Sequence, residues 1–492
     1  MATISEMIAT FPNKEGQDAQ TVALLAIAGA IERSNGIGVQ MGFREIQMLN
    51  RLGLAQKALA AGDQIAVQKM SSISATVSGS ITAAAVDEET FITKMGEVKE
   101  GVYEFSYNGA AWHLDGVAVD LGEYGITVTG TAADGDLIEV HETAGELLFD
   151  IADFDKHHPA NRNLKYSIQL LCSEAVAGFP YNPPQALAVV KSGSLPAGSY
   201  YFGVDANYDA NYNSHEDGNI VFFVLTQPVP EGGQIMLSWP GNTLLKDAKI
   251  STYAKFSTTA IESNIAVEMT DAVGVSVHNL GTITNGELAE QIAGTTGATM
   301  LVNNANRARY GSNDVRSAVM LQWLGSTKKS GWHEQVSPFD RPQTTPTAGL
   351  LYGVDPAFLA ILGKVKLRSA FNTVCKCLSD VGDTTANYYD GEYLGWLPSM
   401  TELGWGANNS VVEGSPDSEG NVGTAAEATF ALFQGASNAD RIRRNNGTAR
   451  YWFLRSPIPS HAYHERLVAT GGALGNLYAN SGVWAVPGLD II

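Results

Sequence analysis

Residues 451–492 read YWFLRSPIPSHAYHERLVATGGALGNLYANSGVWAVPGLDII, and this stretch decides how the rest of the chain is interpreted. From Arg455 onward it mixes Tyr, His, Asn, Ser and Gly with single aliphatic residues and follows no clean helix or strand period. Such residues suit a recognition surface, because aromatic side chains supply contact area at little entropic cost and small polar ones adapt their hydrogen bonds. An ordinary exposed loop region has a similar composition. Composition alone therefore supports a binding surface and an idle loop equally.

The whole chain has 492 residues, of which 45% are hydrophobic, enough for a sizeable core and about two to four domains. Its net charge of -20 disfavours nucleic acids and anionic membranes as partners. We find no signal peptide and no uncharged run long enough to span a bilayer, so synthesis in the cytoplasm without membrane insertion is expected. Three cysteines exclude a disulfide framework.

The N-terminal region is predicted to be helical. Apolar residues recur at helical spacing over 17–33 and again over 43–60, with a Gly-rich break between them. Their apolar faces are too wide for a lone helical hairpin, so they need cover from the rest of the chain or from sister subunits. Residues 1–60 are therefore assigned to attachment or oligomerisation.

The middle of the chain is predicted to form β modules, at 61–158 and 159–245. Turns of the NG, DG and ADGD type interrupt period-two alternation in the first module, which predicts hairpins. The alternation predicts that the segment LLFDIADFD (147–155) pairs with QIAVQ (64–68), which would make 71–145 an inserted module. LPAGSYYFGVD and GNIVFFVLTQ predict a further hairpin in the second module.

Residues 246–492 have a mixed pattern. Helices are predicted over 313–325 and 355–368, and long aromatic-rich loops surround short strands. The predicted fold class is β-rich α+β, with an N-terminal helical segment and small β-sandwich-like modules.

No metal site or cofactor is predicted. The loop DANYDANYNSHE places Asp205, Asn207, Asp209, Asn211, Asn213 and Glu216 at calcium-loop spacing. Ala210 stands where that loop needs Gly, so a polar hairpin loop is the preferred interpretation and calcium the weaker one. Cys375 and Cys377 lack further zinc ligands nearby. His157 and His158 are interpreted as solvated connector residues.

An enzyme is not predicted. The sequence contains no G-x-S-x-G, no Walker loop, no dinucleotide fingerprint and no H-E-x-x-H. Its many carboxylates leave a glycosidase pair open, but nothing singles out two of them.

Several motifs carry a family resemblance: RARYGSNDVRSAVMLQWLGS (307–326), FDRP (339–342), AGLLYGVDPAFLAILGKVKLR (348–368), YWFLRSP (451–457) and the ending GV-x-x-P-x-x-x-I. The chain resembles a family of tail or other virion proteins from gut phages. The C-terminal domain of that family is similar to the C-type lectin fold of proteins diversified by retroelements, a fold shared with formylglycine-generating enzymes. The resemblance implies such a domain over 246–492, with a variable region at 451–492.

The resemblance also divides the variable region into two sets of residues. The implied scaffold positions are Trp452, Leu454, Arg455, Ser456, Pro457, Arg466, Val468, Gly472, Ala479, Gly482, Val483 and Pro487. The implied ligand-facing positions are Ile458, Ser460, His461, Tyr463, His464, Leu467, Ala469, Thr470, Ala473, Gly475, Asn476, Leu477, Tyr478, Asn480 and Ser481. Trp484 departs from the family ending and is assigned to neither set. Adenine mutagenesis of Asn codons cannot produce Lys, Gln, Glu, Met or Trp, and 458–482 contains only Glu465 among these.

The function implied is that of a virion protein, in a tail fibre, tip or other surface-exposed structure, that binds a host cell-surface glycan or protein. The N-terminus would join other virion proteins, and a homotrimer is expected by analogy with phage fibres. Two alternatives stay open: a structural or decoration protein without receptor binding, and a glycan-active enzyme.

Overall fold

The computed structural model describes residues 42–186, 188–196, 198–204, 219–225, 228–235, 254–255, 298–302, 307, 310–341, 347–371, 387–458 and 461–492. Outside these ranges lie the helix predicted at 17–33, the candidate calcium loop with Asp205, Asn207, Asp209 and Glu216, the pair Cys375 and Cys377, and Ser460. Strands outnumber helices in the described part of the chain, which confirms the predicted β-rich α+β class.

The largest sheet runs in the order β19-β26-β9-β7-β3-β4-β5, with β1 paired to β7. Its strands are β1 (Gln64–Ser78), β3 (Gly101–Tyr107), β4 (Trp112–Leu114), β5 (Val117–Val119), β7 (Leu137–Phe154), β9 (Ile168–Cys172), β19 (Gly395–Trp396) and β26 (Gly488–Ile491). Ile65 lies opposite Phe149 and Val67 opposite Leu147, so the predicted pairing of QIAVQ with LLFDIADFD is confirmed. Because β26 pairs with both β9 and β19, the C-terminal strand shares a sheet with segments from 64–172.

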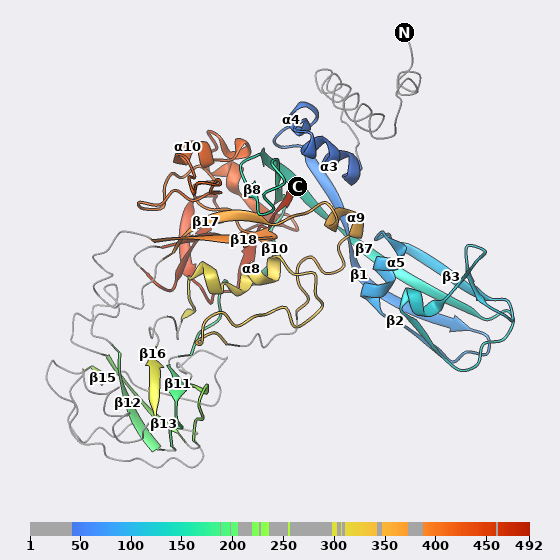
Figure 1. Ribbon diagram of the computed structural model, residues 1–492, viewed down its shortest axis with the longest axis horizontal. Coiled ribbons are helices and arrows are strands. Elements are labelled where there is room, and N and C mark those ends of the chain that lie inside the picture. Colours follow the sequence, from blue (N-terminus) through green and yellow to red (C-terminus); the bar gives the residue numbers. More distant parts are fainter. Residues whose placement is uncertain are drawn as a thin grey trace, which may run out of the picture.

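Residues 71–145 form an arm that projects from the body (Figure 1). The arm carries α5 (Glu88–Met95), the 3₁₀ turn η1 (Leu121–Tyr124), and the paired strands β2 (Ala83–Val86) and β6 (Ile126–Thr129). It has a core of its own, which includes the buried rings of Phe91 and Phe105. Glu88 accepts hydrogen bonds from Lys329 Nζ (2.8 Å) and Tyr352 Oη (2.5 Å), and these contacts tie the arm to the body.

The predicted hairpin turns of the arm are present. Asp115 and Gly116 both have positive φ, at 50° and 77°, which is the requirement of a type I′ turn between β4 and β5. At the preceding turn, Asn108 Oδ1 accepts hydrogen bonds from the backbone N–H groups of Ala110 and Ala111. Short-range turn chemistry therefore sets the strand register here.

A second sheet contains most of the C-terminal region, in the order β10-β25-β22-β23-β24. Its strands are β10 (Val176–Phe179), β22 (Trp452–Pro457), β23 (His464–Val468), β24 (Leu474–Tyr478) and β25 (Val483–Ala485). Strand β24 is an edge strand, and β23 and β24 form a hairpin in which His464 lies opposite Tyr478.

Smaller sheets complete the structure. They comprise β8 (His158–Pro159), β17 (Val365–Phe371) and β18 (Asn387–Tyr393); β11 (Ala188–Ser192), β14 (Gln234–Ile235) and β16 (Thr299–Val302); β12 (Gly198–Val204), β13 (Asn219–Leu225) and β15 (Ala254–Lys255); and β20 (Arg443–Asn445) with β21 (Thr448–Arg450). The predicted hairpin of LPAGSYYFGVD with GNIVFFVLTQ is confirmed by the pairing of β12 with β13. In Figure 1 the β11 and β12 sheets lie at the lower left, apart from the arm at the right.

The helices are short: α3 (Phe43–Arg51), α4 (Ala55–Ala58), α8 (Val319–Leu324), α9 (Pro356–Leu359), α10 (Ala425–Ala428), and the 3₁₀ turns η3 (Val315–Ser317), η5 (Ala431–Phe433) and η6 (Ala439–Arg441). None of the described helices is long and apolar enough to cross a bilayer. Helix α3 packs on the end of the chain, since Asn50 Nδ2 donates to the carbonyl of Ile491 (3.1 Å) and Gln47 Nε2 to that of Ile492 (3.0 Å).

Three helix predictions need correction. The pattern over 313–325 gives the 3₁₀ turn η3 and the helix α8, which are separated by the extended backbone of Ala318 (ψ 110°). The pattern over 43–60 gives two helices, because Gly53 adopts a φ of 66° between α3 and α4. The pattern over 355–368 gives only the one-turn helix α9, followed by strand β17. In β17 the side chains of Val365 and Leu367 are buried while Lys366 and Arg368 are half-exposed, so VKLR follows the period of a strand.

Candidate functional site

The scaffold positions implied by the resemblance are mostly buried. Trp452, Leu454, Arg455, Ser456, Pro457, Val468, Gly472, Ala479, Val483 and Pro487 all lie in the interior. Arg466 is half-buried, with Nε donating to Asn408 Oδ1 (3.3 Å). Gly482 is exposed, and a Cβ added there would meet no atom within 4 Å. Packing therefore explains ten of these positions but not the glycine at 482.

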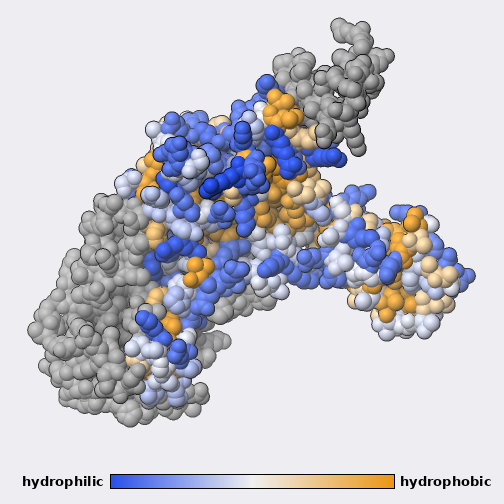
Figure 2. Space-filling model, in the orientation of Figure 1, coloured by the Kyte–Doolittle hydropathy of each residue, from blue (hydrophilic) through white to orange (hydrophobic). Residues whose placement is uncertain are grey.

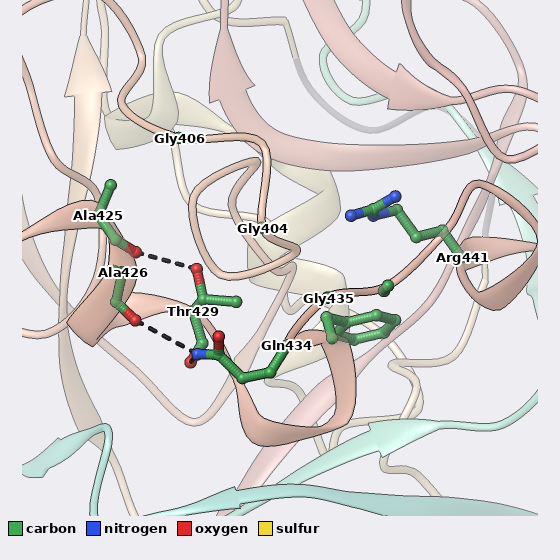
Figure 3. Close-up of a pocket in the computed structure, with 10 residues that line it drawn as sticks. Gly404, Gly406, Ala425, Ala426, Thr429, Gln434, Gly435 and Arg441 are labelled. Carbon is green, nitrogen blue, oxygen red and sulfur yellow. Dashed lines mark hydrogen bonds between the residues drawn. The ribbon is translucent and has the colours of Figure 1, made fainter.

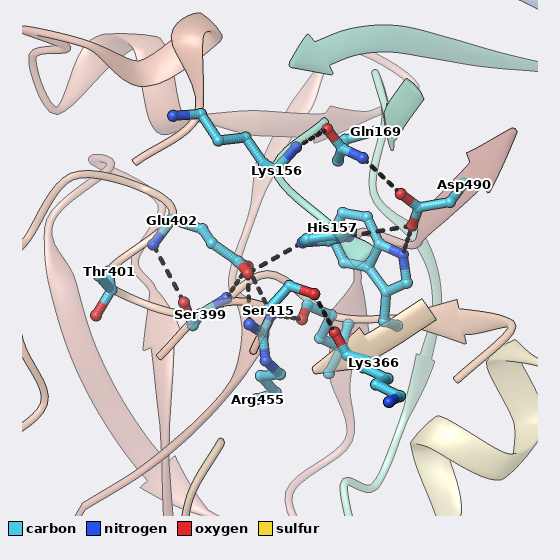
Figure 4. A network of polar contacts seen from close by, with 12 residues as sticks. Lys156, His157, Gln169, Lys366, Ser399, Thr401, Glu402, Ser415, Arg455 and Asp490 are labelled. Atoms are coloured by element: carbon cyan, nitrogen blue, oxygen red, sulfur yellow. Dashed lines mark hydrogen bonds and ion pairs between the residues drawn. The ribbon is translucent and has the colours of Figure 1, made fainter. Parts of the chain in front are cut away.

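Arg455 anchors strand β22 in a buried polar network (Figure 4). Its guanidinium donates to both carboxylate oxygens of Glu402 at 2.5 Å and to the carbonyl of Leu397 at 2.8 Å. Arg455 is 0% exposed and Glu402 is also fully buried. Burial acts to raise the pKa of Glu402, but the charge of Arg455 and hydrogen bonds from His157 and Arg455 outweigh it and lower that pKa to about 2.

His157 joins Glu402 to a second buried carboxylate, Asp490 of strand β26. Its Nε2 lies 3.2 Å from Glu402 Oε1, and its Nδ1 lies 3.1 Å from Asp490 Oδ2. Because carboxylates only accept, both ring nitrogens carry protons in this arrangement. Burial acts to lower the pKa of His157, but the Asp490 charge and the hydrogen bonds raise it to about 9. Asp490 also accepts from Trp396 Nε1 (2.6 Å) and Gln169 Nε2 (2.7 Å).

This network corrects the interpretation of His157 as a solvated connector residue. It also contains buried polar residues that the sequence did not indicate. His158 is exposed, as expected for a connector, but His157 is 1% exposed and holds two distant segments together. Its partners lie 245 and 333 residues away along the chain. No local motif marks such a contact, because it depends entirely on the tertiary fold.

Glu465 is the one residue of 458–482 that adenine mutagenesis of Asn codons could not have produced, and the structure places it in the interior. It is 0% exposed, and no side chain in the described part of the chain donates a hydrogen bond to it. Burial, reinforced by the charge of Glu413, raises its pKa well above the usual range for Glu. Glu465 is therefore a core residue whose burial favours the protonated form, rather than part of an exposed surface.

The ligand-facing positions separate by burial. Exposed or half-exposed are Ile458, His461, His464, Ala469, Thr470, Ala473, Gly475, Asn476, Leu477, Tyr478, Asn480 and Ser481, and these are called the outer positions below. Tyr463 and Leu467 are instead 5% and 1% exposed. Leu467 packs in a hydrophobic cluster with Phe453. Tyr463 and Leu467 are therefore reassigned from the ligand-facing set to the interior. Trp484 is half-buried under the guanidinium of Arg450, 4.6 Å from the ring centroid.

Aromatic rings gather at one end of the β23–β24 hairpin. Tyr310 stacks on Tyr478 with ring centroids 4.0 Å apart, and His464 lies 4.8 Å from Tyr478 and 5.1 Å from His461. Asn313 fixes the backbone beneath them, since its Nδ2 donates to the carbonyls of His461 (2.6 Å) and His464 (2.9 Å). The segment around 310–313 therefore supports the outer positions from below.

Comparison with known proteins gives one match. Residues 366–489 match the family model of a domain of unknown function, DUF6273. No curated protein and no solved structure matches the chain. The matched region includes the network residues Glu402 and Arg455 and every outer position. It covers about a quarter of the chain. Within the described residues, no group of three or more His, Cys, Asp or Glu could hold a metal ion.

Proposed function

We propose that this chain is a phage virion protein that binds a ligand on the host cell surface through the outer positions of its C-terminal segment. The observation that carries the proposal is the division of 452–487 into buried anchors and outer positions within the same short strands. In β23 and β24, Arg466 and Asn476 lie opposite each other on the accessible side, while Glu465 and Leu467 are buried.

Such a division lets side chains change without loss of the fold. Substitutions at exposed positions away from packing contacts usually alter stability by less than about 0.5 kcal/mol. The anchors resist change for the opposite reason, since Arg455 and Trp452 are fully buried and hydrogen-bonded. A surface with these properties is suited to recognising varied ligands, as the resemblance to retroelement-diversified lectin-like proteins implies.

Residues 1–60 would attach the chain to other virion proteins or to sister subunits. Helix α3 contacts the end of the chain through Asn50 and Gln47, so an attachment there would be connected directly to strand β26 of the largest sheet. A homotrimer would present several copies of the outer positions, and avidity would then offset weak binding by each copy.

The competing proposal is a structural or decoration protein whose C-terminal segment packs on other virion proteins. One feature favours it: β24 is an edge strand, and an edge strand offers unpaired backbone groups to a neighbouring chain. The two proposals differ in whether the outer positions are accessible in the assembled particle.

Binding of the fluorescently labelled, full-length chain to a panel of gut bacteria, followed by flow cytometry, tests the proposal. The double variant Asn476→Lys and Leu477→Lys changes two exposed residues of β24. We expect the double variant to bind cells at least about tenfold more weakly than the unmodified chain, because it introduces two positive charges into the proposed contact surface. The control is Val336→Lys, at a position that is 55% exposed and far along the chain. Equal binding by the double variant and the control would refute the proposal.

A further inference from the structure

A cavity of about 310 Å³ lies beside the buried network, between the loop of Gly404 and Gly406, helix α10 and the turn η5 (Figure 3). Most of its lining residues are small: Gly404, Gly406, Ala425, Ala426, Gly435 and Ala436. Small side chains leave the space open, and the backbone of the first two glycines holds positive φ angles of 84° and 86°. Its volume is at the lower end of the range of ligand pockets, about 300–1,000 Å³.

One cation is directed into this cavity. The guanidinium of Arg441 points toward Gly404, across from Ala426 and Gln434 (Figure 3). Arg441 is only 5% exposed. Its Nε donates to the carbonyl of Leu403 (2.8 Å), while its two terminal nitrogens have no acceptor among the described residues. These terminal N–H groups face the cavity, where they can donate to a bound molecule.

The guanidinium is held in place by its surroundings. It lies over the ring of Trp405, 4.4 Å from the centroid. The loop that contains Trp405 is fixed in turn by Glu402 of the buried network, whose carboxylate accepts from the backbone N–H of Ser399 (2.8 Å). The nearby carboxylate of Asp440 already accepts from the N–H and hydroxyl of Ser437. The open edge of the guanidinium is therefore preorganised for a ligand that is not part of the described chain.

Gln434 supplies the complementary group. Its Nε2 donates to the carbonyls of Ala426 (3.3 Å) and Thr429 (3.1 Å), which fixes the amide, and its Oε1 has no donor among the described residues. The cavity thus offers a planar pair of donors on one side and a single acceptor on the other. A carboxylate matches the first, and a hydroxyl group matches the second.

Charge narrows the ligand further. The segment 441–450 carries Arg441, Arg443, Arg444 and Arg450, a basic cluster in a chain of net charge -20. The remaining three face elsewhere: Arg443 pairs with Asp150 (3.5 Å), Arg444 donates to Gly447 and Arg450 covers Trp484. The one available guanidinium can bind a single carboxylate through two parallel hydrogen bonds.

We propose that this cavity binds a small hydroxylated carboxylate, of the class of an acidic monosaccharide, with Arg441 on the carboxylate and Gln434 on a hydroxyl. The proposal is independent of the outer positions, because none of them lines the cavity. A ligand of about 13 non-hydrogen atoms at ordinary ligand efficiency would bind with a Kd of about 1 mM.

Ligand-observed NMR titration of the full-length chain tests this site, with glucuronate as the probe and glucose and inorganic phosphate as comparisons. Arg441→Met is the obvious variant, but loss of the Leu403 contact would disturb the loop. Ala426→Glu is cleaner, because Ala426 is an exposed cavity residue on α10. It places a negative charge at the cavity, and Ala426→Gln adds nearly the same bulk without the charge.

We expect glucuronate to bind the unmodified chain and the Ala426→Gln variant, and the Ala426→Glu variant to bind at least about tenfold more weakly. Glucose and phosphate should each bind at least about tenfold more weakly than glucuronate. Equal binding of glucose would remove the role of Arg441, and equal binding of phosphate would remove the sugar-acid assignment. No detectable glucuronate binding at 20 times the expected Kd, about 20 mM, would overturn the proposal.

Discussion

The charge on His157 gives the sharpest prediction, because this residue lies between two buried carboxylates and joins the loop of Glu402 to Asp490 in strand β26. The change is His157→Gln, which preserves polarity and removes the titratable group. In the folded protein the pKa of His157 is raised from 6.5 to about 9 by Asp490 and Glu402 against the opposing effect of burial. Each tenfold change in proton affinity corresponds to about 1.4 kcal/mol, so protonation contributes about 3 kcal/mol to the free energy of unfolding.

The sign of the pH dependence follows from the direction of this shift. A basic group whose pKa is raised on folding binds its proton more tightly in the folded state. Its contribution is fully present below the unfolded pKa of about 6.5 and is lost as the pH rises through about 9. The unmodified chain should therefore exceed the His157→Gln variant in stability most strongly at pH 6, and the difference should narrow by about 3 kcal/mol by pH 10.

Urea unfolding followed by tryptophan fluorescence measures this difference, and Trp396 is a local reporter, since its ring lies 4.7 Å from that of His157. The matched control is His158→Gln, at the adjacent exposed position. Comparing each variant with the unmodified chain at the same pH cancels other titrating groups such as Lys69, whose pKa burial lowers to about 8. A stability difference that stays constant from pH 6 to pH 10 would refute a charged His157.

Three further predictions concern the same interior. Arg455→Met removes the guanidinium that binds both carboxylate oxygens of Glu402 and leaves His157 as the remaining cationic partner. It should lower the free energy of unfolding by about 3–5 kcal/mol in urea titrations, and unchanged stability would be the contrary outcome. The unmodified chain should lose stability as the pH rises above the usual pKa range of Glu, because the folded state binds the Glu465 proton more tightly than the unfolded state does. The Glu465→Gln variant should lack this decline, and a variant that keeps it would contradict a raised pKa for Glu465. Gly488→Ala places a Cβ 2.2 Å from a buried tryptophan ring and should lower the melting temperature. The control Gly482→Ala, whose Cβ meets no atom within 4 Å, should melt within about 2 °C of the unmodified chain. Equal changes in melting temperature for the two variants would contradict this packing.

The sequence was informative wherever a local rule decides the structure. The Asp115–Gly116 turn and the alternation in QIAVQ and LLFDIADFD predicted the right pairings, because turn type and period two constrain neighbouring strands directly. The helix expected at 355–368 failed for a related reason. The apolar residues of its second half fit both periods, and pairing with β18 and β8 selected the strand.

The candidate site was less accessible to sequence reasoning. Burial of Tyr463 and Leu467 depends on packing against segments such as that of Tyr310, which the sequence places more than a hundred residues away. The same holds for His157, whose two carboxylate partners belong to separate strands and loops. Residue type predicted a polar connector there, but the local sequence contains no information about which charges meet it in the fold.

Site-specific labelling of assembled particles can show whether the outer positions contact the host cell. Leu477→Cys places a thiol at an outer position that is 37% exposed on the edge strand β24. We expect a maleimide–polyethylene glycol reagent to react at this position in intact particles and to block adsorption to host cells. Particles without the added cysteine should adsorb normally after the same treatment. Labelled particles that adsorb as well as unlabelled ones, or a thiol that is occluded by other virion proteins, would contradict it.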